Sequence, residues 1–246
     1  MSEDLTALLT SWEYDPDDTT RIIQAEDGRR VLQVRLPLGI EQYELDGRPD
    51  GLQPFGTDTV VDHIEAEVAL FASQNGDDSG YEIDHAAAGA LQNEGILFYY
   101  RYLLLFQLND FERVARDTSH NLRLCSLLER YCPREADRNA VLQYKPYILR
   151  MNAISRAMLS IQNDVKDVAE SIVRQAIRRI EELEDIDSPT FRFEKARSVT
   201  YLQSALRQMD KQPLNQKDEL KMELEKAVEN EEYERAAELR DRLRKM

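Results

Sequence analysis

The side chains best suited to metal binding or acid–base chemistry in this chain are its three histidines, His63, His85 and His120. His63 and Glu65 have the H-x-E spacing in which a histidine binds zinc and a glutamate transfers protons, but no P-C-x-x-C segment follows. Asp117 and His120 lie one helical turn apart, where they could share a ligand or a hydrogen bond, although a capped or surface histidine is the commoner outcome. We therefore predict no metal site and no cofactor.

Nucleophilic and phosphate-binding motifs give no positive case for catalysis either. Cys125 and Cys132 are seven residues apart, a spacing that fits neither a disulfide framework nor a CxxC metal site. No G-x-S-x-G, phosphate-binding loop or dinucleotide fingerprint is present. An enzyme stays open as an alternative, because catalytic carboxylates could not be recognised among 47 acidic residues.

The net charge of −15 is concentrated at one end of the chain. Residues 1–97 hold 21 acidic side chains against 5 arginines, a balance of −16, and no lysine precedes Lys145. Residues 98–213 are at +3 (16 acids, 19 bases) and residues 214–246 at −2 (10 acids, 8 bases). A negative field repels nucleic acid and favours basic partners, so we predict no direct nucleic-acid contact. The simpler interpretation, that the charge only keeps the protein in solution, is favoured.

Targeting signals are not visible in the sequence. The N-terminal residues MSEDLTALL are acidic and carry no basic n-region of a signal peptide. No apolar run approaches the roughly 18 residues that a membrane span needs. With so few cysteines, a reducing cytoplasm is the expected location, without membrane contact.

The N-terminal part is expected to form a small antiparallel sheet. Residues 21–25 and 30–36 are β-branched runs joined through Asp27-Gly28, a strong hairpin signal, and residues 40–45 alternate again. A helix from Thr57 or Asp58 to Asn75 should cover the sheet, because three strands need a covered face.

From about Asp84 onward the sequence predicts helices separated by short breaks. Within residues 84–108, the stretch from Ile96 to Phe106 is apolar on nearly all sides, which predicts a central buried helix with Tyr99, Tyr100 and Tyr102 in the core. Pro146 should kink or split a helix over 134–161. Strands first and helices afterwards indicate a mainly α, α+β fold. The expected domains are an acidic sheet-plus-helix domain at 1–80, a helical body at 84–210 and a hairpin at 214–246.

Three stretches share a pattern in which polar residues interrupt an apolar helix and a bulky residue restarts it. They are residues 109–115, 163–169 and 231–237, with Phe111, Val165 and Tyr233 as the bulky residues. Small or β-branched residues follow three and four positions later, where a returning helix would pack closely. The bulky residues are 54 and 68 apart rather than 34. The pattern therefore predicts tetratricopeptide-like αα-hairpins without a regular array.

The last 33 residues read LNQKDELKMELEKAVENEEYERAAELRDRLRKM, two short amphipathic helices around residues 229–232. The apolar stripe of the second helix spans roughly 160° at about 100° per residue. A single partner helix cannot cover so wide a face, and helices of three or four turns are marginal alone. The hairpin should thus complete its burial against another protein, another copy or the body of the chain. The expected contact residues are Leu220, Leu224, Val228, Tyr233, Ala236, Ala237, Leu239 and Leu243, with Arg240 and Asp241 as orienting charges.

This tail resembles the UVR motif, the helical hairpin of the UvrB and UvrC excision-repair proteins. The matching residues are Leu224, Ala227, Val228, Glu231 or Glu232, Tyr233-Glu234, Ala236-Ala237 and Leu239-Arg240-Asp241-Arg242-Leu243. In that family the hairpin is a protein–protein contact, and it also occurs in Clp-type protease ATPases and in the activator of protein arginine kinase. The zinc-binding CxxC pairs of that activator and any Walker A sequence are absent here.

What the resemblance implies is docking rather than catalysis or DNA binding. Residues 27–51 are similar to uncharacterised bacterial proteins that end in a UVR motif, which gives no mechanism. We expect an adaptor or regulatory protein in repair, Clp proteolysis or a stress response. An enzyme with an unrecognised N-terminal active site is second, and an acidic decoy of a nucleic-acid-binding protein is third.

Overall fold

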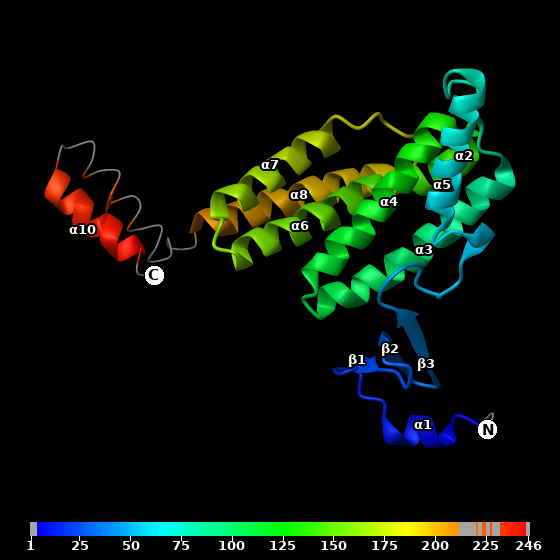
Figure 1. Ribbon diagram of the computed structural model, residues 1–246, viewed down its shortest axis with the longest axis horizontal. Helices are drawn as coiled ribbons and strands as arrows, with labels where there is room; N and C mark the ends of the chain where they lie inside the picture. Colours follow the sequence, from blue (N-terminus) through cyan, green and yellow to red (C-terminus); the bar gives the residue numbers. More distant parts are fainter. Residues whose placement is uncertain (1–3, 212–219, 221–222, 225–226, 228–231, 245–246) are drawn as a thin grey trace. The chain divides into compact units, whose positions relative to one another are not determined.

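Figure 1 shows the computed structural model, which describes residues 4–211, 220, 223–224, 227 and 232–244. Helices dominate and the strands form one antiparallel sheet, which confirms the predicted fold class. The helices are α1 (Thr6–Ser11), α2 (Val60–Asn75), α3 (His85–Gln107), α4 (Phe111–Tyr131), α5 (Glu135–Leu142), α6 (Lys145–Gln162), α7 (Lys166–Glu181), α8 (Pro189–Lys211) and α10 (Tyr233–Arg244), with a 3-10 turn at Pro54–Gly56. In the described part of the chain, no helix is both long enough and apolar enough to span a membrane.

The chain divides into two compact units, Met1–Gln203 and Ser204–Met246. The predicted boundaries at residues 80, 84, 210 and 214 stay a prediction. Of the predicted linker, Lys211 ends α8, whereas Gln212 and Pro213 lie outside the described residues.

The three strands lie where the sequence predicts them. β1 (Thr20–Gln24) pairs with β2 (Arg30–Leu36), and β2 pairs with β3 (Gly39–Glu44). In the β1–β2 turn, the amide of Gly28 donates to the carbonyl of Ala25 (2.9 Å), and Gly28 has a φ of 87°. A side chain is strained at that φ, which explains the glycine.

Both faces of β2 are covered, but not by the helix expected to cover the sheet. Leu32 clusters with Tyr102 and Leu105 of α3. On the opposite face, Nε of Arg35 donates to the carbonyl of Trp12 (2.6 Å), the residue that follows α1. Figure 1 shows the sheet lying between α1 and α3. The prediction was wrong because an amphipathic face shows that a helix is covered, but not by which element.

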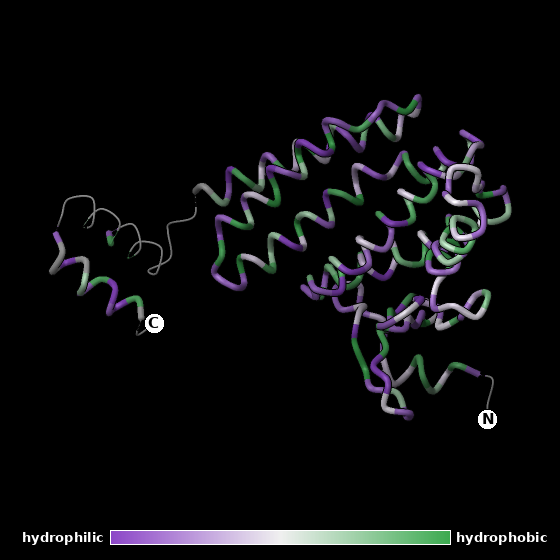
Figure 2. Tube along the Cα trace, turned by 45° about the horizontal axis from the view of Figure 1, so that its top comes forward, coloured by the Kyte–Doolittle hydropathy of each residue, from purple (hydrophilic) through white to green (hydrophobic). Residues whose placement is uncertain are grey.

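The apolar face of α2 instead joins the main helical core. Val60, Val61 and Ile64 are buried together with Leu91 of α3 and Leu128 of α4. In Figure 2 hydrophobic and hydrophilic positions alternate along these helices, as expected when each has one packed side. One core cluster of the first unit therefore lies between α2, α3 and α4, and another joins the sheet to α3, α4 and α6.

Of two predicted helix boundaries, one differs from the structure and one agrees with it. The N-cap of α2 is Thr59, whose Oγ1 accepts from the amide of Asp62 (3.0 Å), rather than Thr57 or Asp58. Pro146 lies in the first turn of α6 and splits the predicted helix into α5 and α6, as one of the two predicted outcomes required.

The helix α3 is less buried than its composition predicts. Tyr102 is buried, but Tyr99, Tyr100 and Ile96 are exposed, so the prediction of a helix buried on all sides was wrong. The physical reason is that the sheet, α2, α4, α5 and α6 pack against other parts of α3 and leave this part of its surface uncovered. The exposed tyrosine rings lie against one another, with Tyr99 and Tyr100 centroids 5.4 Å apart.

Two αα-hairpins, α3–α4 and α6–α7, close by the same hydrogen bond. The amide of Asp110 donates to the carbonyl of Leu105 (2.9 Å), and the amide of Val165 donates to the carbonyl of Ser160 (2.9 Å). The residue before each donor adopts a left-handed φ, which defines a Schellman motif. These residues are Asn109 (57°) and Asp164 (58°). The hairpins are confirmed, but Asn109 corresponds to Asp164, one residue away from the Asn163 that the sequence pattern aligned with it.

Candidate functional site

The C-terminal unit holds the hairpin for which a partner-binding role is predicted. Leu239 of α10 is buried, and Leu243 is partly buried beside it. They pack with Leu220, Leu224 and Ala227 from the segment before the turn. The apolar stripes of the two segments therefore pack against each other within the hairpin.

The turn of this hairpin closes as the other two do. The amide of Glu232 donates to the carbonyl of Ala227 (2.7 Å), a bond that spans five residues, like those of Asp110 and Val165. Glu232 directly precedes α10, as Asp110 precedes α4. Tyr233 thus corresponds to Phe111, as the sequence pattern predicts.

The predicted contact residues that the structure describes fall into two groups. Leu220, Leu224, Leu239 and Leu243 lie in the apolar cluster of the hairpin itself. The exposed ones are Ala237, Arg240 and Asp241. The guanidinium of Arg240 lies 3.7 Å from the Asp241 carboxylate. Val228 lies outside the described residues, as do the side chains of Tyr233 and Ala236.

Residues 215–246 match the family model described as the UvrB/uvrC motif. The tail therefore carries a UVR motif, which is known for protein–protein or DNA-repair-related interactions. The match covers 32 of 246 residues, and no other family model matches. No curated protein and no solved structure matches the chain.

In the first unit, a buried carboxylate connects three elements. Glu94 of α3 accepts hydrogen bonds from the amides of Val60 (2.7 Å) and Val61 (3.1 Å), the first two residues of α2. It also accepts from Arg48 (2.8 Å) and lies 3.1 Å from Nε2 of His120. Burial by itself raises the pKa of Glu94, but the His120 and backbone hydrogen bonds outweigh it and hold the pKa below its ordinary value. The ionised carboxylate of Glu94 thus caps the N-terminus of α2, although Glu94 belongs to another helix.

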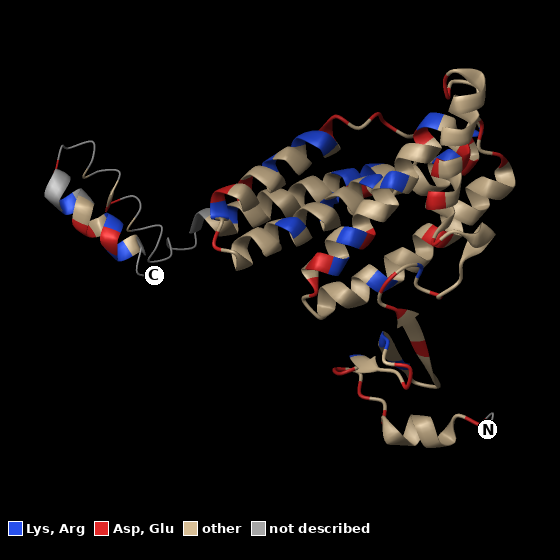
Figure 3. Ribbon diagram, in the orientation of Figure 1, with Lys and Arg blue, Asp and Glu red and all other residues tan. Residues whose placement is uncertain are grey.

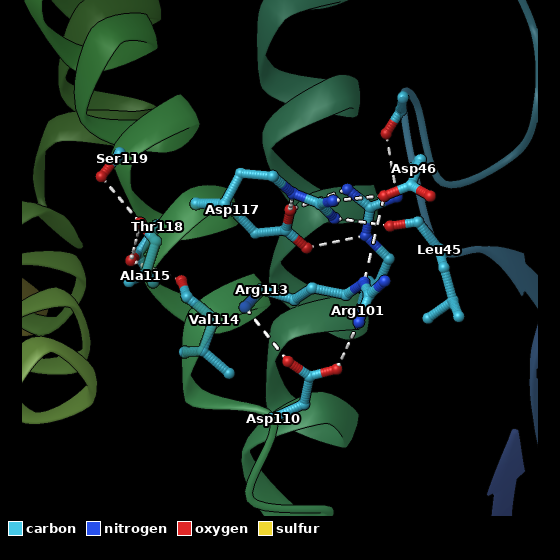
Figure 4. Close-up of polar contacts among 12 residues, drawn as sticks. Leu45, Asp46, Arg101, Asp110, Arg113, Val114, Ala115, Asp117, Thr118 and Ser119 are labelled. Carbon is cyan, nitrogen blue, oxygen red and sulfur yellow. Dashed lines mark hydrogen bonds and ion pairs between the residues drawn. The ribbon is translucent and has the colours of Figure 1, made fainter. Parts of the chain in front are cut away.

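A second buried pair lies seven residues further along α3. Nε and Nη2 of Arg101 bind both oxygens of Asp117 at 2.7 and 2.8 Å, and both side chains are fully buried. Nη1 of Arg101 donates to the carbonyls of Glu44 (2.8 Å) and Gly47 (2.9 Å), where the chain leaves β3. Figure 4 shows Arg101 between the helices and the Leu45–Asp46 segment.

Arg116 extends this cluster at the surface. Its Nε lies 3.0 Å from Asp117, its Nη1 donates to Asp46 (2.7 Å) and its Nη2 to the carbonyl of Leu45 (2.6 Å). The pairing of Asp117 with His120 that their spacing allowed is not formed, because Asp117 binds Arg101 and His120 lies against Glu94, both on α3. His120 is buried rather than at the surface, the outcome that the sequence favoured. This network connects the sheet to the helices, and its buried oxygens are already occupied by protein donors.

The remaining histidines and the cysteines lie in separate surroundings. His63 stacks on Phe55 with centroids 4.4 Å apart, and His85 lies 2.9 Å from the Asp137 carboxylate. Among the described residues, no group of His, Cys, Asp and Glu could hold a metal ion. Burial raises the pKa of the Cys125 thiol to about 12, which keeps it protonated at neutral pH.

Sequence reasoning missed the buried pairs, although a signal exists. Glu94 and Arg101 are seven residues apart and share the side of α3 that carries Leu91, Phe98 and Tyr102. A charged residue on a buried helical face requires a partner. The pattern could therefore have predicted buried ion pairs, but not their partners.

Proposed function

We propose that this protein is a non-catalytic adaptor that docks onto a protein partner through its C-terminal hairpin. The UVR match at residues 215–246 carries this proposal. Repair, Clp proteolysis and a stress response are the processes in which such a hairpin would act.

The geometry of α10 supports a partner contact on the side that faces away from the hairpin's own apolar cluster. At about 100° per residue, Leu239 and Leu243 point to the inner side, whereas Ala237 lies about 160° from Leu239. Arg240 and Asp241 flank Ala237 on this outer side and are exposed. A small residue between two charged ones lets a partner helix approach closely and fixes its orientation.

The test compares two exposed positions on opposite sides of α10. Ala237→Glu should abolish capture of the partner from native extract, because it buries an unpaired carboxylate in the contact. Arg242→Ala is the control, because it changes the net charge by the same amount. Arg242 lies on the side of α10 that carries Glu238, so this substitution should leave capture unchanged. Both substitutions retain good helix formers. Equal capture of all partners by Ala237→Glu and the unsubstituted protein would contradict the docking role.

Self-association is the second form of the same proposal. Analytical ultracentrifugation of the chain with and without residues 214–246 separates it from docking onto a different protein. A mass that halves on deletion of the hairpin identifies a second copy as the partner. A small-molecule-dependent activity that survives the deletion would instead favour an enzyme in the N-terminal part.

A further inference from the structure

The first unit contains an open groove of about 470 Å³ beside α4, unrelated to the UVR hairpin. Its walls come from α4, α6 and α7, with Glu65 of α2 at one side. Four arginines line it, Arg123, Arg130, Arg156 and Arg179. Figure 3 shows basic residues along these helices, in a chain whose net charge is −15.

Two of these arginines are already neutralised within the protein. Arg123 lies 2.9 Å from the carboxylate of Asp62 and also binds Glu65. Arg130 lies 2.7 Å from the carboxylate of Asp78. Their charges are therefore compensated by the N-terminal segment.

The other two arginines are different. Arg156 of α6 and Arg179 of α7 are exposed and form no ion pair with any described residue. Two uncompensated guanidiniums from separate helices thus face one cavity. Guanidinium donors form a planar fork that matches the oxygens of phosphate and carboxylate, so an oxyanion is the ligand that suits this pair of side chains.

We infer that this groove binds a small molecule that carries two or more phosphate groups. A diphosphate neutralises both free guanidiniums at once, whereas one carboxylate leaves a positive charge unpaired. The volume lies in the range of small-molecule sites. The overall negative charge of the chain repels nucleic acid and therefore disfavours it as the ligand. The apolar side chains of Leu122 and Leu127 line the same groove and can contact the rest of the ligand.

Calorimetric titration of the full chain with inorganic pyrophosphate tests this inference. Arg156→Ala and Arg179→Ala should each weaken the affinity about tenfold or more, since each removes a charge-assisted contact. Arg178→Ala is the matched control. Arg178 neighbours Arg179 on α7, is exposed and without an ion pair to any described residue, and does not line the groove. It should leave the affinity within about twofold.

Further arms distinguish the competing outcomes. Arg156→Lys keeps the charge but not the fork, so it should bind pyrophosphate more weakly than the unsubstituted chain even if Arg156→Ala fails to fold. The inference is overturned if the unsubstituted chain does not bind pyrophosphate, or if Arg178→Ala weakens binding as much as the groove variants do. Tighter binding of a hexaglutamate peptide than of pyrophosphate would also overturn it, and would identify an acidic protein segment as the occupant. Deletion of residues 214–246 should leave pyrophosphate binding unchanged.

Discussion

Replacing Arg101 by methionine should remove the contact that holds the β3 exit on the helices. The guanidinium makes four hydrogen bonds, two to Asp117 and two to the carbonyls of Glu44 and Gly47. Methionine retains most of the buried aliphatic volume, so the change removes polar contacts with a small packing cost.

The size of the effect follows from what is left unpaired. Removing one partner of a buried ion pair costs about 3–5 kcal/mol. Arg116 remains 3.0 Å from Asp117, which places the cost near the lower end of that range. The two carbonyls lose a donor, and each buried unpaired group adds about 1–3 kcal/mol where water cannot replace it. We expect a loss of about 5 kcal/mol in the free energy of unfolding.

Urea denaturation followed by circular dichroism measures this loss. The double variant Arg101→Met with Asp117→Leu should be more stable than Arg101→Met alone, because it leaves no buried charge unpaired. A loss below about 1.5 kcal/mol for the single variant would refute the assignment of the pair as a structural connection. Additive effects of the two substitutions would refute the coupling between them.

Three further predictions concern single side chains. The folded-state pKa of Glu94 is lowered, so its ionised form stabilises the fold above its ordinary pKa of 4.5, and this contribution is lost as the pH falls through the folded-state value. Glu94→Gln should therefore lower the free energy of unfolding at pH 7 by about 2–3 kcal/mol. In unfolding curves recorded below pH 4.5, the difference in stability between the variant and the unsubstituted protein should become smaller; a difference that does not change with pH would contradict this. Cys125 should react with an aromatic disulfide reagent at pH 8 at least about tenfold more slowly than in the denatured chain, because its pKa is raised to about 12; equal rates would disprove the burial argument. Leu239→Ala should destabilise the hairpin by about 2–5 kcal/mol, seen as faster amide exchange in α10 with residues 1–203 unaffected, and unchanged α10 protection would show that Leu239 does not hold the hairpin together.

Local sequence signals predicted the elements well because their causes are local. Asp27-Gly28 placed the β-hairpin through a conformation that only glycine adopts easily. The polar break at Asn109-Asp110 placed the α3–α4 turn, because the Schellman closure needs a residue that tolerates a left-handed φ. These features require no knowledge of distant residues.

The tertiary partners could not be predicted, because one sequence does not show which covered faces meet. The apolar face of α2 was recognised, yet it packs on Leu91 and Leu128 rather than on the sheet. Asp117 and His120 were singled out as neighbours on one helix. Their actual partners, Arg101 and Glu94, lie on α3 at 16 and 26 residues' separation. In the UVR hairpin, likewise, the sequence showed the apolar stripe of the second helix. It did not show that Leu239 and Leu243 pack inside the hairpin whereas Ala237 is exposed.

The uneven charge of the chain has a structural counterpart along α4. This helix carries three arginines at a spacing of seven residues, which places them on one side. Each contacts an acidic residue of the N-terminal third, and the acidic residues follow one another at a spacing of 16. The pairs are Arg116–Asp46 (2.7 Å), Arg123–Asp62 (2.9 Å) and Arg130–Asp78 (2.7 Å).

These three pairs set register more than stability. They lie at the surface, where an ion pair contributes about 0–1 kcal/mol, whereas the buried Arg101–Asp117 pair fixes the position of the β3 exit at much greater cost if broken. An N-terminal segment shifted along α4 would lose all three contacts together, so the row disfavours wrong alignments. Part of the −16 charge of residues 1–97 is thus compensated within the protein. This weakens the case for an acidic docking surface, and the UVR hairpin stays the proposed site of contact with a partner.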